Sequence, residues 1–398
     1  MKNILLNYQR LTQTEEYAFE NVFQKPEYDW PGDWEGRALL AFMCHYQMHK
    51  NKAPCMEEMI RVLPTRTNEK LYFGALFDGK IVDEQQLSGH NWYLRGLVKY
   101  AETFDSEFAR IAAKSVVENL YLPALNWYRN YPIKRERNGG VSGSIACVKN
   151  GWKLSTDVGC AFMCVDGLAH YYAYTRDARV KALVDEIIQI FFHAEYVKNG
   201  FQTHTTLTCA RGILRMYLAT GEAQYLAQAE RVFDDYLRYG MTLTYENFNW
   251  FGREDTWTEP CAMVDSLILA TQLYQIKKEK AYLTLARRIW LNGLQFCQRP
   301  NGGAGPNTCV TKSQPVWKVS LYEAPFCCTM RYAEGLLTYT ENQELFAWDN
   351  TAAWVTDVQG RTFADDKLIV KINGKQTPAP AGYEFSQEAL LELEMQVL

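Results

Sequence analysis

The chain has 398 residues, of which 47% are hydrophobic and 22% charged, and its formal net charge is −4. This is the composition of an ordinary globular protein, and it excludes a disordered, collagen-like or coiled-coil chain. A charge so close to neutral also argues against a protein built to bind nucleic acid.

The first eight residues contain neither an apolar stretch of signal-peptide length nor a small-residue cleavage site. No stretch approaches the ~20 apolar residues that a membrane helix needs. We therefore expect a cytoplasmic protein with no membrane partner. The eleven cysteines, an odd number scattered through patterned segments, are expected to be reduced thiols.

A weak motif recurs along the chain: an aromatic residue, a Thr or Lys about three residues later, and then an acidic residue. Its copies, the first and last of them looser, begin at Tyr46, Tyr100, Tyr172, Tyr217, Tyr274 and Tyr339. Each unit has the pattern of a helix, a turn and a second helix. Six units predict a mainly α protein, an (α/α)6 toroid of six helical hairpins, and leave an open superhelix as the alternative.

The pattern changes after about residue 344, where two segments, 367–373 and 391–397, alternate with a period of two. Such alternation is typical of strands. We therefore predict two domains: an (α/α)6 catalytic domain at 1–343 and a short β-rich appendage at 344–398. The last strand is expected to pack on the barrel or to pair with a neighbour.

Polar, aromatic and thiol residues recur about 10–15 residues before each repeat marker, where the chain enters an inner helix. In a toroid these connections open at one end, so their side chains would surround one cavity mouth. His90, Trp92 and His204 lie at this position of their repeats. The aromatic ring of Trp92 would suit a sugar face, and the two histidines are equally consistent with a structural role and with ligand contact.

The most specific group of residues at these positions combines Glu259-x-Cys261 with the adjacent pair Cys327-Cys328. Three thiols and a carboxylate from two neighbouring hairpins can form a four-coordinate zinc site, because thiolates favour this metal. The alternative is a set of buried structural cysteines. A disulfide within the pair is disfavoured, since adjacent cysteines cannot easily reach its geometry.

Several carboxylates also lie near the expected mouth, namely Glu246, Glu254, Asp255 and Glu259. One of them could serve as a general acid, which must lie near the leaving group and have a raised pKa. The residue pattern does not choose among them.

Five segments follow one another in an order that matches a known family: 204–212, 217–221, 245–248, 259–262 and 327–329. Over roughly residues 85–340 the chain thus resembles the β-L-arabinofuranosidase family of glycoside hydrolases, six-hairpin enzymes with a zinc–thiolate centre. The resemblance implies that Cys327 is both nucleophile and zinc ligand, and that Glu259, Cys261 and Cys328 complete the site.

The same resemblance implies that Glu246 is the general acid/base, with Glu254 as its competitor, and that His90 and His204 contact the sugar. The implied function is a retaining glycoside hydrolase acting on a small glycoside or oligosaccharide, such as a β-L-arabinofuranoside. Two alternatives stay open: a six-hairpin sugar epimerase or isomerase using histidines, and a zinc-stabilised carbohydrate-binding protein without turnover. Assembly into a homo-oligomer is left open.

Overall fold

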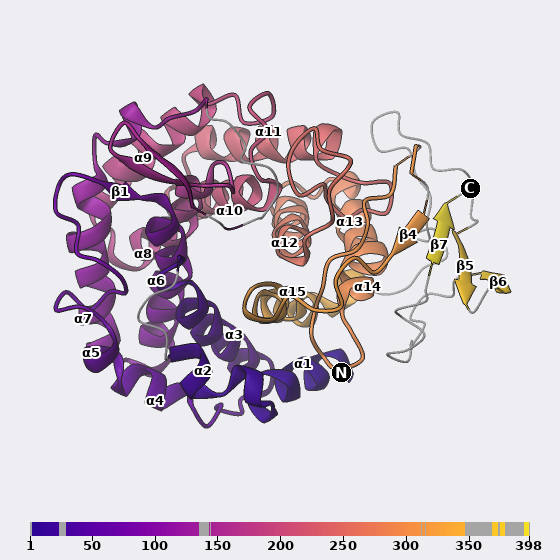
Figure 1. Cartoon of the computed structure of the whole chain (residues 1–398), viewed down its shortest axis with the longest axis horizontal. Coiled ribbons are helices and arrows are strands. Elements are labelled where there is room, and N and C mark those ends of the chain that lie inside the picture. Colours follow the sequence, from indigo (N-terminus) through magenta and orange to yellow (C-terminus); the bar gives the residue numbers. More distant parts are fainter. Residues whose placement is uncertain are drawn as a thin grey trace. The chain divides into compact units, whose positions relative to one another are not determined.

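The computed structural model describes residues 2–23, 29–134, 143, 145–311, 313–314, 316–346, 368–372, 375–378 and 394–397. The chain divides into two compact units, Glu15–Val232 (the N-terminal unit) and Met1–Thr14 with Phe233–Leu398 (the C-terminal unit). Both are mainly helical in their described parts, as the sequence predicts (Figure 1).

The N-terminal unit is built from successive helical hairpins. Its helices are α2 (Phe19–Phe23), α3 (Asp33–His49), α4 (Met56–Arg61), α5 (Leu63–Arg66), α6 (Glu84–Phe104), α7 (Glu107–Val116), α8 (Cys164–Thr175), α9 (Ala178–His193), α10 (Thr203–Thr220) and the start of α11 (Ala223–Tyr239). Helix α3 packs on α6, α6 on α8, and α8 on α10, while α7 pairs with α6 and α9 with α8.

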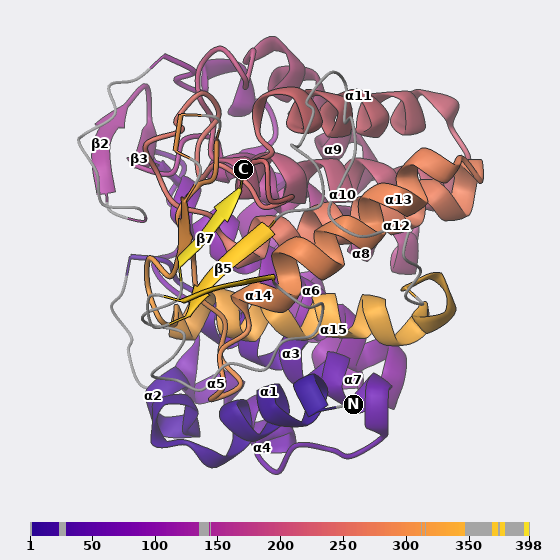
Figure 2. The ribbon, with the colours of Figure 1, turned by 90° about the vertical axis from the view of Figure 1, so that its right-hand side faces the viewer.

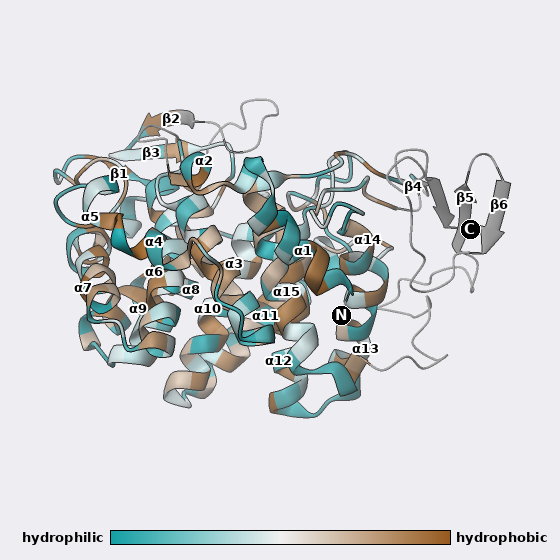
Figure 3. Ribbon diagram, turned by 90° about the horizontal axis from the view of Figure 1, so that it is seen from below, coloured by the Kyte–Doolittle hydropathy of each residue, from teal (hydrophilic) through white to brown (hydrophobic). Residues whose placement is uncertain are grey.

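The first helix of a hairpin is buried on nearly every side, and the second on only one. In α10 the buried residues run without a break from Thr203 to Leu214. In α9 they recur every three or four positions, from Val180 to Phe191, which is the pattern of an amphipathic helix. Helices α9 and α13 accordingly carry both hydrophilic and hydrophobic residues (Figure 3).

The repeat motif of the sequence is the turn inside each hairpin. The helix ends at a residue in the left-handed conformation, with φ 61° at Arg176, 75° at Gly221 and 59° at Lys278. In these three hairpins an acidic residue follows at the start of the next helix; the side chain of Asp177, for example, accepts a hydrogen bond from the N–H of Arg179 at 2.9 Å. The motif therefore combines a helix C-cap with an N-cap.

The C-terminal unit contains α1 (Lys2–Gln13), the end of α11, α12 (Pro260–Lys277), α13 (Lys280–Arg288), α14 (Gln295–Cys297) and α15 (Met330–Glu341). Helix α15 contacts both α12 and α1, so the start of the chain packs beside its sixth repeat (Figure 2). The amide of Asn7 in α1 donates to the carbonyls of Gly302 and Thr329 at 3.0 and 3.1 Å.

Two small sheets complete the described structure. In the N-terminal unit β1 (Val82–Asp83), β3 (Trp152–Ser155) and β2 (Ile145–Lys149) pair in that order. In the C-terminal unit the order is β4 (Val316–Lys318), β7 (Glu394–Val397), β5 (Leu368–Ile372) and β6 (Lys375–Pro378).

Strands β5 and β7 lie within the two segments that the sequence predicts as strands. The predicted pairing of the last strand with a neighbour also occurs, since β7 lies antiparallel to both β4 and β5. The domain boundary at residue 343 stays a prediction, because residues 347–367 are outside the described part. Every helix in the described part is too short or too polar to span a membrane.

Candidate functional site

Glu259 and Cys261 are positioned by the start of α12. Glu259 has extended backbone (φ −129°, ψ 114°), and Pro260 opens the helix, where its missing N–H leaves no intrahelical bond unmade. The N–H of Glu259 donates to Oδ1 of Asn247 at 3.0 Å, which anchors this segment to an adjacent loop. Cys261 is fully buried, and Glu259 is 8% exposed.

Cys327 and Cys328 lie in a π-helical turn, Pro325–Thr329, that leads into α15. The N–H of Thr329 donates to the carbonyl of Ala324 at 3.2 Å and closes the turn. A π turn places successive side chains about 80° apart, against about 100° in an α-helix. Two adjacent thiols can therefore face the same side of the backbone.

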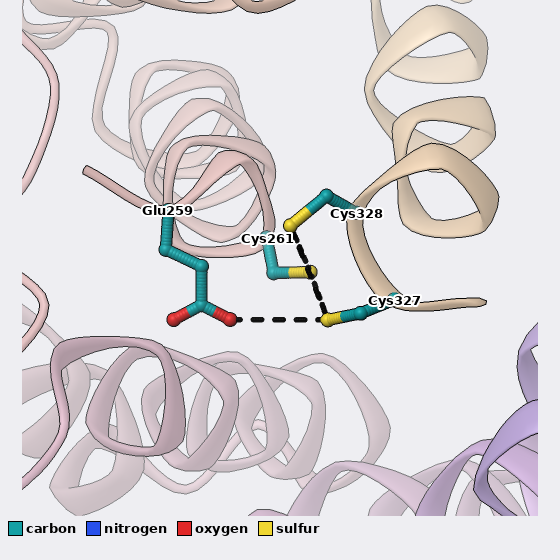
Figure 4. A group of neighbouring side chains, drawn as sticks. All are labelled: Glu259, Cys261, Cys327 and Cys328. Carbon is teal, nitrogen blue, oxygen red and sulfur yellow. Dashed lines mark hydrogen bonds between the residues drawn. The ribbon is translucent and has the colours of Figure 1, made fainter. Parts of the chain in front are cut away.

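The structure brings the four predicted ligands together (Figure 4). Sγ of Cys261 lies 3.3 Å from Sγ of Cys327 and 3.7 Å from Sγ of Cys328, and the two adjacent sulfurs are 4.0 Å apart. Oε1 of Glu259 is 4.0 Å from Sγ of Cys327. All four ligand atoms lie within 4.8 Å of one another, so this group could hold a metal ion.

The contacts within the cluster favour the neutral thiol of Cys328. Hydrogen bonds with Cys261 and Cys327, followed by burial, raise the pKa of Cys328 well above its usual range. A coordinated metal reverses that preference, because it holds its thiol ligands deprotonated.

A buried ion pair joins the two segments that carry the cysteines. Arg331 of α15 donates to Oδ1 of Asp265 of α12 at 2.6 Å, and it also pairs with Glu334. Asp265 follows Cys261 by one helical turn, and Arg331 follows Cys328 by a similar distance along the chain. This contact fixes how closely α12 approaches α15 beside the thiols.

Glu246 is fully buried in the C-terminal unit, which also contains the thiol cluster, and hydrogen-bond donors surround its carboxylate. Its Oε1 accepts from Nδ2 of Asn307 at 2.7 Å and from Oγ1 of Thr258 at 3.4 Å, and its Oε2 accepts from Oγ1 of Thr244 at 2.7 Å. Burial raises the pKa of Glu246 to about 7, and the hydrogen bonds from Asn307, Thr244 and Trp317 and the charge of Arg299 limit the rise. Its competitor Glu254 is exposed.

His90, in the N-terminal unit, is fully buried, and both ring nitrogens are bonded within the protein. Nε2 accepts from the N–H of Phe73 at 3.0 Å, so Nδ1 carries the proton and donates to the carbonyl of Gln86 at 2.8 Å. Burial lowers the pKa of His90 to about 4, although the bond to Gln86 opposes the shift. These contacts favour a structural role, and sugar contact by His90 stays a prediction.

Trp92 and His204 lie together in the same unit. Their rings stack at 5.7 Å with an interplanar angle of 5°, and the guanidinium of Arg37 lies 4.6 Å from the centre of the Trp92 ring. Nδ1 of His204 is 3.3 Å from Oγ1 of Thr208. Both rings are almost fully buried, at 0% and 2% exposure, and their contact with a sugar stays a prediction.

The residue pattern did not indicate the residues that surround Glu246 and Glu259, above all Asn307, Thr244, Thr258 and Asn247. Thr244 stands two residues before Glu246, but a single threonine carries no specific signal. Asn307 is separated from Glu246 by 61 residues, and nothing in the local pattern connects the two.

No family model matches the sequence, and no curated protein matches it either. Solved structures do match. A GH127 β-arabinofuranosidase gives a TM-score of 0.57 at 12% sequence identity, over 85% of this chain and 57% of that protein. A GH127 β-L-arabinofuranosidase from Geobacillus stearothermophilus T6 gives 0.56 at 11% identity, over 86% and 62%. A cellobiose 2-epimerase from Spirochaeta thermophila gives 0.50 at 13% identity, over 85% and 97%.

These neighbours are six-hairpin helical enzymes, and they confirm the predicted fold class. The predicted resemblance to β-L-arabinofuranosidases is confirmed at the level of the fold. The chain spans about three fifths of the length of those hydrolases, and an epimerase shares the fold. The comparisons therefore leave the reaction open.

Proposed function

We propose that the protein is a retaining glycoside hydrolase with a zinc-bound cysteine nucleophile, Cys327, and a glutamate acid/base, Glu246. The observation that carries the proposal is the convergence of Glu259, Cys261, Cys327 and Cys328 on one point. The GH127 β-arabinofuranosidases among the structural neighbours support it and suggest a small glycoside or oligosaccharide, such as a β-L-arabinofuranoside, as substrate.

The spacing of the three sulfurs fits tetrahedral zinc. A Zn–S bond of about 2.3 Å at the tetrahedral angle separates two sulfurs by about 3.8 Å. The three distances here, 3.3, 3.7 and 4.0 Å, lie on either side of that value. Glu259 would be the fourth ligand, and its present distance of 4.0 Å from Cys327 requires only a small adjustment to reach the ~3.5 Å expected for a sulfur and an oxygen on one zinc.

Cys327 is the thiol best placed to react. Cys261 and Cys328 are 0% and 3% exposed, whereas Cys327 is partly exposed. Bound zinc would supply a low thiol pKa, so that the nucleophile is a thiolate at neutral pH. Sγ of Cys327 can then contact a substrate, while the buried thiols of Cys261 and Cys328 hold the metal.

Cys327 would act as the nucleophile and Glu246 as the acid and base of the reaction. Sγ of Cys327 attacks the anomeric carbon, and the carboxyl of Glu246 gives its proton to the departing oxygen. Glu246, now ionised, takes a proton from water, which displaces the sulfur and restores the thiolate. Two displacements at one carbon return the sugar with its starting configuration.

Glu246 suits the double role of acid and base because its pKa of about 7 allows both protonation states near neutral pH. Glu254 remains the competing acid/base, since it lies in an exposed loop of the same unit. The proposal keeps Trp92 and His204 as sugar-contacting residues, whereas the two bonded ring nitrogens of His90 favour a structural role for that residue.

A second candidate is a sugar epimerase, because a cellobiose 2-epimerase shares the fold, with a TM-score of 0.50 over 85% of this chain. Such an enzyme would use histidines as acid and base and would need no thiol cluster. The enclosed ring of His90 counts against this alternative.

A panel of nitrophenyl glycosides, assayed with added zinc, tests the proposal. We expect turnover of at least one glycoside and its loss in Cys327→Ala. Proton NMR, read before mutarotation, should show that the first product retains its configuration. An inverted first product, together with near wild-type turnover by Cys327→Ser, would leave Cys327 as a metal ligand only. Epimerisation without hydrolysis, by metal-free protein, would favour the second candidate.

A further inference from the structure

While Glu246 is ionised, the hydrogen bonds around its carboxylate have fixed directions. On one side, the N–H of Glu246 donates to Oγ1 of Thr242 at 3.1 Å. Oγ1 of Thr242 lies 3.0 Å from Oγ1 of Thr244, which donates its own proton to Oε2 of Glu246. Since Thr244 has only that one proton, Thr242 must be the donor in the bond between the two hydroxyls.

Asn307 occupies the other side, where its amide orientation is set by Arg299. Nη2 of Arg299 donates to Oδ1 of Asn307 at 2.9 Å, and Nδ2 of Asn307 donates to Oε1 of Glu246 at 2.7 Å. The flipped amide would turn its NH2 group toward the guanidinium and its carbonyl toward the carboxylate. Both contacts would be repulsive, so only the observed orientation satisfies the network.

Arg299 is itself immobilised. It is 1% exposed; its Nε donates to the carbonyl of Tyr322 and its Nη1 to the carbonyl of Phe296. Nη2, which donates to Asn307, also lies within hydrogen-bond distance of the carbonyl oxygens of Gly305, Pro306 and Leu321. A guanidinium held by so many fixed acceptors cannot rotate to release Asn307.

We propose that Asn307 is a positioning residue that keeps Oε1 of Glu246 an acceptor and thereby places the catalytic proton on Oε2, beside Thr244. Nδ2 of Asn307 can only donate, so a proton on Oε1 would have only the hydroxyl of Thr258, at 3.4 Å, to accept it, whereas a proton on Oε2 lies 2.7 Å from the hydroxyl of Thr244. The hydroxyl of Thr244 can rotate and accept, so a proton on Oε2 is accommodated. This inference rests on the proposed role of Glu246 and specifies which of its oxygens carries the proton.

The charged and titratable groups that influence Glu246 are few. The positive charge of Arg299 favours the ionised carboxylate. Cys297 and Cys309 are buried beside it, and burial raises the pKa of both thiols far above its usual range, so they stay neutral. The hydrogen bond from Asn307 is therefore the strongest single contact, after burial, that a substitution can remove.

The test replaces Asn307 by leucine, which has a similar shape and no donor. Loss of a hydrogen bond to an ionised group is expected to raise the pKa of Glu246 and to move the basic limb of kcat/KM upward by about one to two pH units. Asn301→Leu is the matched control. It removes an amide donor to another carboxylate of the same unit, that of Glu323 at 2.9 Å, and should leave the limb in place.

Isotope-edited infrared titration of the Glu246 carboxyl, with Glu246→Gln as the blank, measures the pKa of Glu246 without turnover. If Asn307→Leu does not fold, Asn307→Ala serves in both measurements. The inference would be wrong if a folded Asn307 variant kept both the wild-type basic limb of kcat/KM and the wild-type infrared pKa of Glu246. The proposed role of Glu246 as acid/base would be unaffected by that result. Wild-type turnover by Glu246→Gln would instead overturn the proposed role of Glu246, and the infrared titration would still decide whether Asn307 sets its protonation.

Discussion

The buried carboxyl of Glu246 should make the stability of the protein depend on pH in a way that Glu246→Gln removes. Burial raises the pKa of this group from 4.5 to about 7. The folded state therefore binds the proton more tightly than the unfolded state. The stability that this adds is complete below pH 4.5 and is lost as pH rises through about 7. A shift of about 2.5 units corresponds to about 3 kcal/mol.

Glutamine is the appropriate substitution because it resembles the protonated carboxyl. Its Oε1 can accept from Asn307, and its amide can donate to Thr244 after the hydroxyl rotates. The free energy of unfolding of the variant should match that of the wild type at about pH 4.5 and exceed it by about 3 kcal/mol at about pH 8.

Urea unfolding of both proteins across this range measures the difference, since all other titrating groups are common to the two. The difference in free energy of unfolding between the two proteins should stop rising with pH at about pH 7. A difference that stays constant within about 0.5 kcal/mol would show that the environment of Glu246 does not perturb its proton affinity, and the reasoning would fail.

Three further outcomes are expected. Cys261→Ala should lower both the bound metal and the stability, as seen by elemental analysis and thermal unfolding, because thiolate–metal bonds contribute folding energy. Glu246→Gln should lower kcat by about 10²–10⁴, and less with activated leaving groups, whereas the same pattern in Glu254→Gln would move the role to that residue. Asp265→Ala should cost about 3 kcal/mol because it leaves a buried guanidinium short of a partner. The surface control Glu195→Gln should cost less than about 1 kcal/mol in the same unfolding assay.

The helical repeat and the thiol cluster could be predicted from the sequence because each leaves a local signal. Turn residues such as Arg176 and Asp177 have to satisfy the ends of two helices, and this requirement recurs in every hairpin. Cys261 and Cys327 stand at equivalent positions of successive repeats, so the repeat itself suggested their proximity before the structure placed their sulfurs 3.3 Å apart.

The surroundings of the acid/base could not be predicted in this way. Asn307 and Arg299 lie in an irregular segment, where no periodicity indicates which side chains turn inward. Their roles depend on hydrogen-bond direction, which only coordinates reveal. Similarly, the sequence left His90 equally consistent with ligand contact and with structure, and it was the carbonyl of Gln86 and the N–H of Phe73 that favoured structure.

The central claim is that Glu259, Cys261, Cys327 and Cys328 hold one zinc ion per chain. Elemental analysis of protein purified without added metal, performed alongside the glycoside assay on the same sample, tests it most directly. We predict about one zinc per chain in the wild type and a marked loss in Cys261→Ser. Less than about 0.2 zinc per chain, with hydrolysis of the glycoside intact, would contradict the account.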